Sequence, residues 1–123
     1  MLQNETLIAF VATTDAAAAL AFYRDILGLT LVADEPFALV FDAHGTMLRI
    51  QKAPQHVALP HTAVGWQVSD LAQTVAALVA KGVVMKRYEG MGQDAQGVWT
   101  TPGGARIAWF EDPDRNVLSL TQW

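Results

Sequence analysis

The side chains that could do chemistry in this sequence are few and scattered. Its 123 residues include no cysteine, which excludes a disulfide, a thiol nucleophile and cysteine-bound zinc. The three histidines, His44, His56 and His61, lie in segments where glycine or proline predicts turns and loops. No serine lies in a recognisable nucleophile elbow or near a histidine. The sequence therefore carries no nucleophile–base pair, and we predict no catalytic residue.

The charge balance excludes several classes of partner. The net charge is −4 and the sequence pI is about 5.1, whereas binding to nucleic acid or an anionic membrane needs clustered Lys and Arg. The N-terminus has no basic region ahead of an apolar run, and the longest apolar stretch, residues 71–85, is broken by Lys81 and Gly82. We expect a cytoplasmic protein whose partner is a small molecule.

Hydrophobic periodicity predicts a strand, a helix and three strands in the first half. Residues 6–12 are rich in strand-forming residues, and Asp15 is suited to cap a helix. Gly28 ends that helix, and apolar segments at 29–32, 37–41 and 47–51 follow it. The helix itself is indicated by apolar residues spaced along one face: Ala19, Phe22, Tyr23, Ile26 and Leu27. Residues 1–52 thus read as a βαβββ module.

The same order restarts after a predicted linker at residues 53–61. Residues 63–68 form a strand, Ser69 or Asp70 caps a second helix, and Gly82 ends it. Segments 83–88, 97–101, 105–110 and 117–122 predict the later strands, with one short strand displaced from the βαβββ order. The second helix is expected to carry its apolar residues on one face: Leu71, Val75, Leu78 and Val79. Residues 62–123 form the second module.

The repeat predicts one α+β domain over residues 1–123, with two tandem βαβββ modules forming curved mixed sheets around a cleft. Modules of this length cannot bury their apolar faces alone and must pack together. The competing interpretation is an unrelated α+β sandwich with accidental symmetry.

Two motifs resemble those of a known family. Residues 22–29, FYRDILGL, are similar to the first-helix signature of the glyoxalase, bleomycin-resistance and extradiol dioxygenase superfamily, also called vicinal oxygen chelate. Residues 110–120, FEDPDRNVLSL, resemble its C-terminal hairpin, with Arg115 where the family usually has glycine. The resemblance implies the two-module fold, but this fold hosts isomerases, epimerases, dioxygenases, thiol transferases and non-catalytic drug binders.

The resemblance also implies where a metal would bind. The family's enzymes hold a divalent metal with His, Gln or Glu at four cleft-facing strand positions. Two lie seven residues before Asp15 and Asp70, one lies on the last strand of the first module, and one lies seven residues after Asp112; they hold Ile8, Ala63, Arg49 and Ser119. Isoleucine and alanine have no donor atom, arginine is a fixed cation, and a lone serine is a poor ligand. We therefore predict no metal and no other cofactor.

His61 and Glu111 offer an alternative metal site. His61 precedes Ala63 by two residues and would share its face if the strand extended that far. Glu111 is a carboxylate at a predicted strand end. The competing interpretation is an exposed loop histidine and a carboxylate that is solvated or paired with an arginine.

The remaining residues of the predicted cleft favour binding. Trp109 matches a position that carries a catalytic tyrosine in the dioxygenase branch; indole cannot act as that acid or base, but it stacks on flat or cationic ligands. The alternative role for Trp109 is packing between the modules. Arg49 needs a partner, either an internal carboxylate such as Glu111 or an anionic ligand group. The full set of predicted ligand-binding residues is Ile8, Phe10, Arg49, Ala63, Gln67, Trp99, Trp109, Glu111 and Ser119.

These features favour a metal-free protein that binds an aromatic or amphipathic small molecule and that resembles the bleomycin-resistance proteins. The resemblance also implies a homodimer. The alternative is a metal-dependent lyase, isomerase or dioxygenase with a non-standard metal site. A metal-free enzyme with Arg49 as electrophile is a third hypothesis, for which the sequence offers no base.

Overall fold

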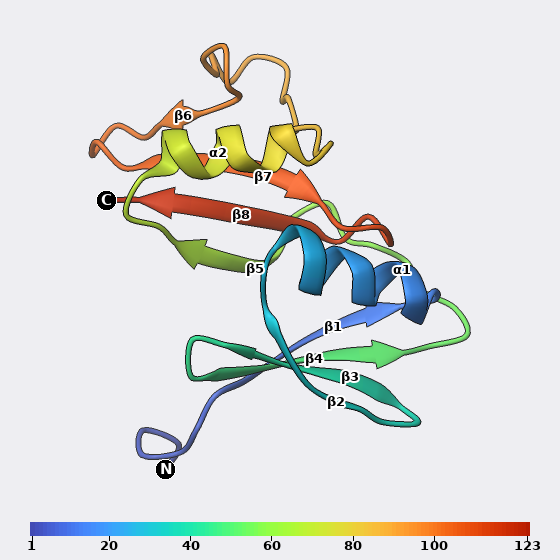
Figure 1. Cartoon of the computed structure of the whole chain (residues 1–123). Helices are drawn as coiled ribbons and strands as arrows, with labels where there is room; N and C mark the ends of the chain where they lie inside the picture. Colours follow the sequence, from blue (N-terminus) through green and yellow to red (C-terminus); the bar gives the residue numbers. More distant parts are fainter. The chain divides into compact units, whose positions relative to one another are not determined.

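The computed structural model describes all residues, 1–123, and divides into two compact units, Met1–Val57 and Ala58–Trp123. Each unit contains one four-stranded mixed sheet and one α-helix (Figure 1). The α+β class and the repeated βαβββ order are therefore confirmed. Neither α-helix has the length and apolar character needed to cross a membrane.

The strands of unit 1 lie in the order β1-β4-β3-β2, and the only parallel pair is β1 with β4. A parallel pair needs a long crossover, and the helical segment and the β2–β3 hairpin supply it. The elements are β1 (Ile8–Thr13), α1 (Ala16–Ala21), η1 (Phe22–Ile26, a π-helix), β2 (Thr30–Asp34), β3 (Ala38–Ala43) and β4 (Thr46–Lys52).

The helical segment of unit 1 begins and ends as its sequence predicts. The Asp15 side chain accepts a hydrogen bond from the backbone N–H of Ala18 at 3.1 Å, which satisfies one of the free amides of the first turn. Gly28 ends the segment with φ +76°, a conformation that glycine adopts without steric cost. Tyr23 is fully buried, and its ring centroid lies 5.9 Å from that of Phe41 on β3. This contact fixes which face of the sheet the helix covers.

Unit 2 repeats the arrangement with the strand order β5-β8-β7-β6, and β5 and β8 are its parallel pair. Asp70 caps the helix and accepts from the N–H of Gln73 at 3.1 Å. The elements are β5 (Thr62–Gln67), α2 (Leu71–Ala80), β6 (Trp99–Thr100), β7 (Arg106–Glu111) and β8 (Val117–Gln122).

Two of the strands expected in unit 2 differ in the structure, at residues 83–88 and 97–101. Residues 83–88 do not form a strand, because Lys86 N–H to Trp109 O, at 2.8 Å, is the single backbone bond that ties this segment to β7. The predicted strand at 97–101 is reduced to the two residues of β6. On α2, Leu71, Val75 and Leu78 are buried, whereas Val79, which lines a pocket together with Val75, is 53% exposed.

Candidate functional site

The sheet of unit 2 separates a face covered by α2 from a face without a helix. Trp66 pairs with Leu120 on β8, which is buried on the helix side, so Trp66 belongs to that side. Gly65 and Trp109 both pair with Ser119, and Ile107 pairs with Thr121 and Trp99. These residues alternate with the helix-side set and therefore lie on the helix-free face. The predicted binding residues that share this face are Gln67, Trp99, Trp109, Glu111 and Ser119.

Three aromatic rings gather on the helix-free face of unit 2, which we name the tryptophan face. The Trp99 and Trp109 rings stack with centroids 6.3 Å apart and planes 29° from parallel. Tyr88 meets Trp109 edge-on at 5.4 Å and 85°. Both geometries are those that the charge distribution of aromatic rings favours. All three side chains are half-buried, so the rings keep part of their surface open to a ligand.

The spacing of the tryptophan pair decides how a flat ligand would bind. A ring inserted between two others needs about 7 Å between their centroids, since carbon atoms in contact are roughly 3.5 Å apart. The 6.3 Å separation of Trp99 and Trp109 is shorter than that. An aromatic ligand must therefore stack on the outer surface of the pair and not between its members.

Lys86 and Glu111 form an ion pair beside these rings. Lys86 Nζ lies 3.2 Å from Glu111 Oε2 and 5.6 Å from the centroid of the Tyr88 ring. The side chains are 27% and 31% exposed, and Arg115 adds a weak contact to Glu111 at 4.0 Å. Because the carboxylate is engaged by cations of the chain itself, it is not a ready metal ligand. The pair leaves this border of the site close to electrically neutral.

Gly65 makes room for Ser119 on the same face. A Cβ at position 65 would lie 2.5 Å from Ser119 Oγ, well inside the contact distance. Ser119 is 8% exposed and pairs in register with Trp109. The serine hydroxyl therefore overlaps sterically with any side chain placed at position 65.

Ala63 lies at an irregularity in β5. Thr62 pairs with Val117 and Val64 pairs with the next residue, Leu118, so Ala63 is an extra residue of the kind found in a β-bulge. Simple alternation along the strand, which is the basis for placing Ala63 in the predicted cleft, does not hold at this residue.

The predicted binding residues of unit 1 share the helix-free face of their own sheet. Ile8 pairs with Met47, and Phe10 pairs with Arg49. Ile8 and Phe10 are 42% and 51% exposed. Arg49 forms an ion pair with Glu35 at 3.1 Å, so its partner is a carboxylate of the β2–β3 hairpin and not Glu111.

The residues present do not fit the metal that the resemblance implies. The four positions hold Ile8 and Arg49 on unit 1 and Ala63 and Ser119 on unit 2, which offer one hydroxyl among them. No group of three or more His, Cys, Asp or Glu side chains is placed to hold a metal ion. His61 is exposed, and its Nδ1 lies 3.4 Å from the carbonyl of Thr62. No step of a mechanism can be assigned to a metal on this donor set.

Tyr88 and Lys86 are members of the tryptophan face that sequence reasoning missed. Both belong to the segment 83–88, which was expected to be a strand, and alternation along it would have put the two residues on one side. The sequence does not show that Tyr88 contacts Trp109 or that Lys86 pairs with Glu111.

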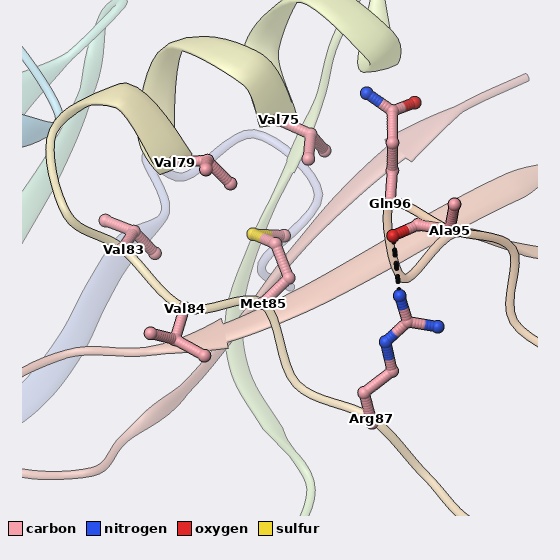
Figure 2. Close-up of a pocket in the computed structure, with 8 residues that line it drawn as sticks. All are labelled: Val75, Val79, Val83, Val84, Met85, Arg87, Ala95 and Gln96. Carbon is pink, nitrogen blue, oxygen red and sulfur yellow. Dashed lines mark hydrogen bonds between the residues drawn. The ribbon is translucent and has the colours of Figure 1, made fainter.

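A separate pocket lies on the helix side of unit 2, between α2 and the chain that follows it (Figure 2). Its volume is about 400 Å³. We name it the valine pocket, after the side chains that form one wall: Val75, Val79, Val83 and Val84. Met85 lies near the middle of the view, and Arg87, Ala95 and Gln96 form the other side.

The sequence matches the family described as the Glyoxalase/Bleomycin resistance protein/Dioxygenase superfamily over residues 6–120. The chain therefore belongs to this superfamily. No curated protein matches it in sequence.

Solved structures of the superfamily share the fold along almost the whole chain. A glyoxalase/bleomycin resistance protein from Catenulispora acidiphila DSM 44928 is 26% identical, with 96% of this chain and 97% of that chain covered and a TM-score of 0.71. The bleomycin resistance determinant encoded on the transposon Tn5 is 20% identical, with 97% and 98% covered and a TM-score of 0.75. Lactoylglutathione lyase from Agrobacterium tumefaciens is 19% identical, with 96% and 93% covered and a TM-score of 0.73. Identities this low show the fold and leave the function to be argued from the residues.

Proposed function

We propose that this protein binds a flat aromatic or amphipathic small molecule on the tryptophan face, without a metal. The observation that carries the proposal is the stacked Trp99–Trp109 pair with Tyr88 against its edge. Stacking on exposed ring surface recognises flatness and needs no acid, base or metal. Sequestration of a compound requires only such affinity.

The neighbours of the rings support a ligand with a polar edge. Gln67 is exposed at the end of β5, on the tryptophan face, and its amide can both donate and accept hydrogen bonds. At Glu111, the carboxylate is already paired with Lys86 at 3.2 Å, so the site imposes no strong net charge on its ligand. A neutral polar aromatic compound is the best match for these groups.

The enzymatic alternative has less support in the donor set. A metal-dependent member of the superfamily would need several N or O donors around one open position. The residues at the implied positions provide a single hydroxyl, and Glu111 is held in an ion pair. Metal analysis of tag-free protein prepared without chelator tests this directly, and stoichiometric Ni, Zn, Mn or Fe would favour the enzyme.

The binding test uses tryptophan fluorescence from the proposed site alone. A Trp66→Phe/Trp123→Phe double variant retains only Trp99 and Trp109 as tryptophan reporters. We expect 2-naphthol or bleomycin to quench this emission in a saturable manner. Naphthoate and naphthylmethylammonium in the same series report the charge preference.

A matched pair of substitutions ties the binding to the rings. Trp109→Ala removes a central stacking partner and should raise the Kd at least about fivefold, since one stacked ring contributes roughly 1 kcal/mol. Trp123→Ala removes the same side chain where it is 79% exposed and outside the cluster, and should leave the Kd unchanged. Calorimetry measures both. If no compound of the series binds, or if Trp109→Ala binds as well as the parent, the proposal is wrong.

We also propose that the protein is a homodimer. The support is an exposed apolar patch on the helix-free face of unit 1, which consists of Ile8, Phe10 and Met47. Contiguous patches of this kind mark interaction surfaces. Sedimentation velocity of the parent and of Phe10→Glu tests this. A parent that sediments as a monomer at all concentrations refutes the dimer.

A further inference from the structure

We propose that the valine pocket is a second ligand site, which takes the anion of an apolar monocarboxylic acid such as a medium-chain alkanoate. This site lies on the helix side of unit 2, whereas Trp99 and Trp109 lie on the helix-free face. The inference does not depend on the proposed function of the tryptophan face.

The walls of the pocket suit a hydrocarbon chain. Val75 and Val79 come from α2, and Val83, Val84 and Met85 come from the segment that follows it. Val79 is 53% exposed and Val84 is 84% exposed, so the protein leaves a valine-rich surface uncovered beside a buried core. The volume of about 400 Å³ lies at the lower end of the range of small-molecule sites, which is roughly 300–1,000 Å³.

Arg87 supplies the charge at the other side of the pocket. It donates from Nη1 to the carbonyl of Asp94 at 2.5 Å and from Nη2 to the carbonyl of Ala95 at 2.6 Å (Figure 2 shows the second bond). These acceptors are neutral, and none of the ion pairs of the protein includes Arg87. Its guanidinium is therefore fixed in direction while its charge is not neutralised by a carboxylate.

The carboxylate of Asp94 does not pair with Arg87 and is hydrogen-bonded within its own turn. Asp94 Oδ1 accepts from the backbone N–H of Gln96 and of Val98, both at 2.9 Å, which holds the turn that forms this side of the pocket. Arg87 keeps further N–H donors beyond the two that it uses, and a carboxylate matches their geometry. The Gln96 side chain, which also lines the pocket, adds an amide donor.

An apolar wall facing a preoriented, unpaired cation selects an amphipathic anion. A hydrocarbon tail covers the valines, and the carboxylate replaces water around the guanidinium of Arg87. A neutral alcohol of the same length would bury the same tail without the charge interaction, and an alkylammonium would be repelled. The pocket is thus expected to rank octanoate above octanol and both above octylammonium.

The experiment is calorimetric titration of the full-length chain with octanoate, octanol and octylammonium below their aggregation concentrations. We expect octanoate to bind with one-to-one stoichiometry and octanol to bind about three- to fivefold more weakly, because Arg87 is exposed and a charge pair at an exposed site contributes less than a tenfold change. Arg87→Gln should produce a loss of similar size. Absence of octanoate binding, or equal Kd values for octanoate and octanol, overturns the proposal.

Val79→Glu and Val32→Glu form the matched pair that locates the site. Val79→Glu places a carboxylate in the pocket at an exposed position, so the fold should tolerate it while octanoate affinity falls at least about tenfold. Val32 is 63% exposed on β2 of unit 1, and Val32→Glu makes the same change outside the pocket and should leave octanoate binding intact. Circular dichroism checks that both variants are folded.

Trp109→Ala separates this site from the proposed function. Octanoate binding that disappears with Trp109→Ala but survives Val79→Glu would place the anion on the tryptophan face and overturn this inference. If octanoate does not bind and Val79→Glu instead converts a dimer to a monomer in sedimentation, the pocket is covered by a second copy of the chain. Retention of octanoate binding in a protein that fails to bind any aromatic compound would refute the proposed function alone.

Discussion

The close approach of Gly65 and Ser119 predicts a strong coupling between these two positions. Gly65→Ala would bring a methyl group to 2.5 Å from Ser119 Oγ, and the next nearest atom, the carbonyl oxygen of Ser119, is 3.5 Å away and in ordinary contact. Ser119 is 8% exposed, so relieving the overlap moves a hydroxyl among buried neighbours and costs about 1–3 kcal/mol, against about 0.5–1 kcal/mol gained by replacing a strand glycine with alanine. Gly65→Ala alone should therefore destabilise the protein by about 1 kcal/mol.

Ser119→Ala removes the atom responsible for the overlap. In that background the new methyl group meets no atom nearer than 3.5 Å, and Gly65→Ala should become neutral or slightly stabilising. The double-mutant cycle should give a coupling of about 1–3 kcal/mol. Urea denaturation followed by circular dichroism measures the four free energies of unfolding. Gly65→Ala costing the same in both backgrounds would show that the hydroxyl does not fill this space and would refute the reasoning.

Three further predictions concern the C-terminal turn and the metal. Arg115 has φ +69°, and Arg115→Gly should raise the free energy of unfolding by about 0.5–1 kcal/mol in denaturant titrations, whereas Arg115→Ala keeps a Cβ at the same φ, loses the 4.0 Å contact to Glu111 and should not raise it. Asp112 is 5% exposed and accepts from the backbone N–H groups of Asp114 and Asn116 and from the Asn116 amide at 2.8–2.9 Å. Asp112→Ala should lower the free energy of unfolding by about 3 kcal/mol, and Asp112→Asn, which turns one acceptor into a donor, by about 1–3 kcal/mol. The diagnostic result is a smaller loss for Asn than for Ala. Ni²⁺, Zn²⁺ or Mn²⁺ should leave the Tm of tag-free protein unchanged, because the four implied positions offer a single hydroxyl. A metal that did bind, at 100 times its Kd, would add about 2.7 kcal/mol of stability, so a rise of several degrees would reveal a metal site.

The capping residues and turns could be predicted because they depend on neighbours in sequence. Asp15 and Asp70 each accept a hydrogen bond from the N–H three residues ahead, at 3.1 Å in both helices. Gly28 and Gly82 have positive φ at the ends of the helical segments, as their positions indicate. Arg115 also has a positive φ, so the left-handed conformation of the C-terminal turn is kept although the residue there is not glycine.

The irregular parts of unit 2 could not be predicted because they depend on pairing between strands. Residues 83–88 contain Val83, Val84 and Tyr88, which favour strands, yet only the N–H of Lys86 finds an acceptor on β7. The extra residue at Ala63 is visible only when β5 and β8 are aligned. The hydrophobic periodicity of a segment indicates whether its residues favour a strand. It does not indicate how many backbone hydrogen bonds the neighbouring strand can form with that segment.

The side chains of the candidate site were predicted in part for a related reason. Trp109 could be assigned to its face of the sheet because a motif fixes the register of β7, and Trp99 lies beside it because the short β6 pairs with β7. The partner of Arg49 was not found, because Glu35 lies in the hairpin between β2 and β3, whose course the sequence pattern does not specify. Tyr88 was missed because its contribution comes from a segment that lies against β7 without joining the ladder.

Segment 83–88 connects the two proposed sites physically. Lys86 and Tyr88 turn toward Glu111 and Trp109, whereas Met85 and Arg87 line the valine pocket. The segment is held by one backbone bond to β7, by the bond from Val83 N–H to the carbonyl of Leu78, and by Arg87, which donates to the carbonyls of Asp94 and Ala95. The Gln93 amide adds two bonds, because it donates to the carbonyl of Lys86 at 3.0 Å and accepts from the N–H of Tyr88 at 2.6 Å. Most of these bonds involve side chains or loop carbonyls, and only the N–H of Lys86 joins the segment to the ladder of β7. Side-chain bonds, and not a strand ladder, therefore fix the residues on both sides of this segment, which is why periodicity along the sequence does not reveal them.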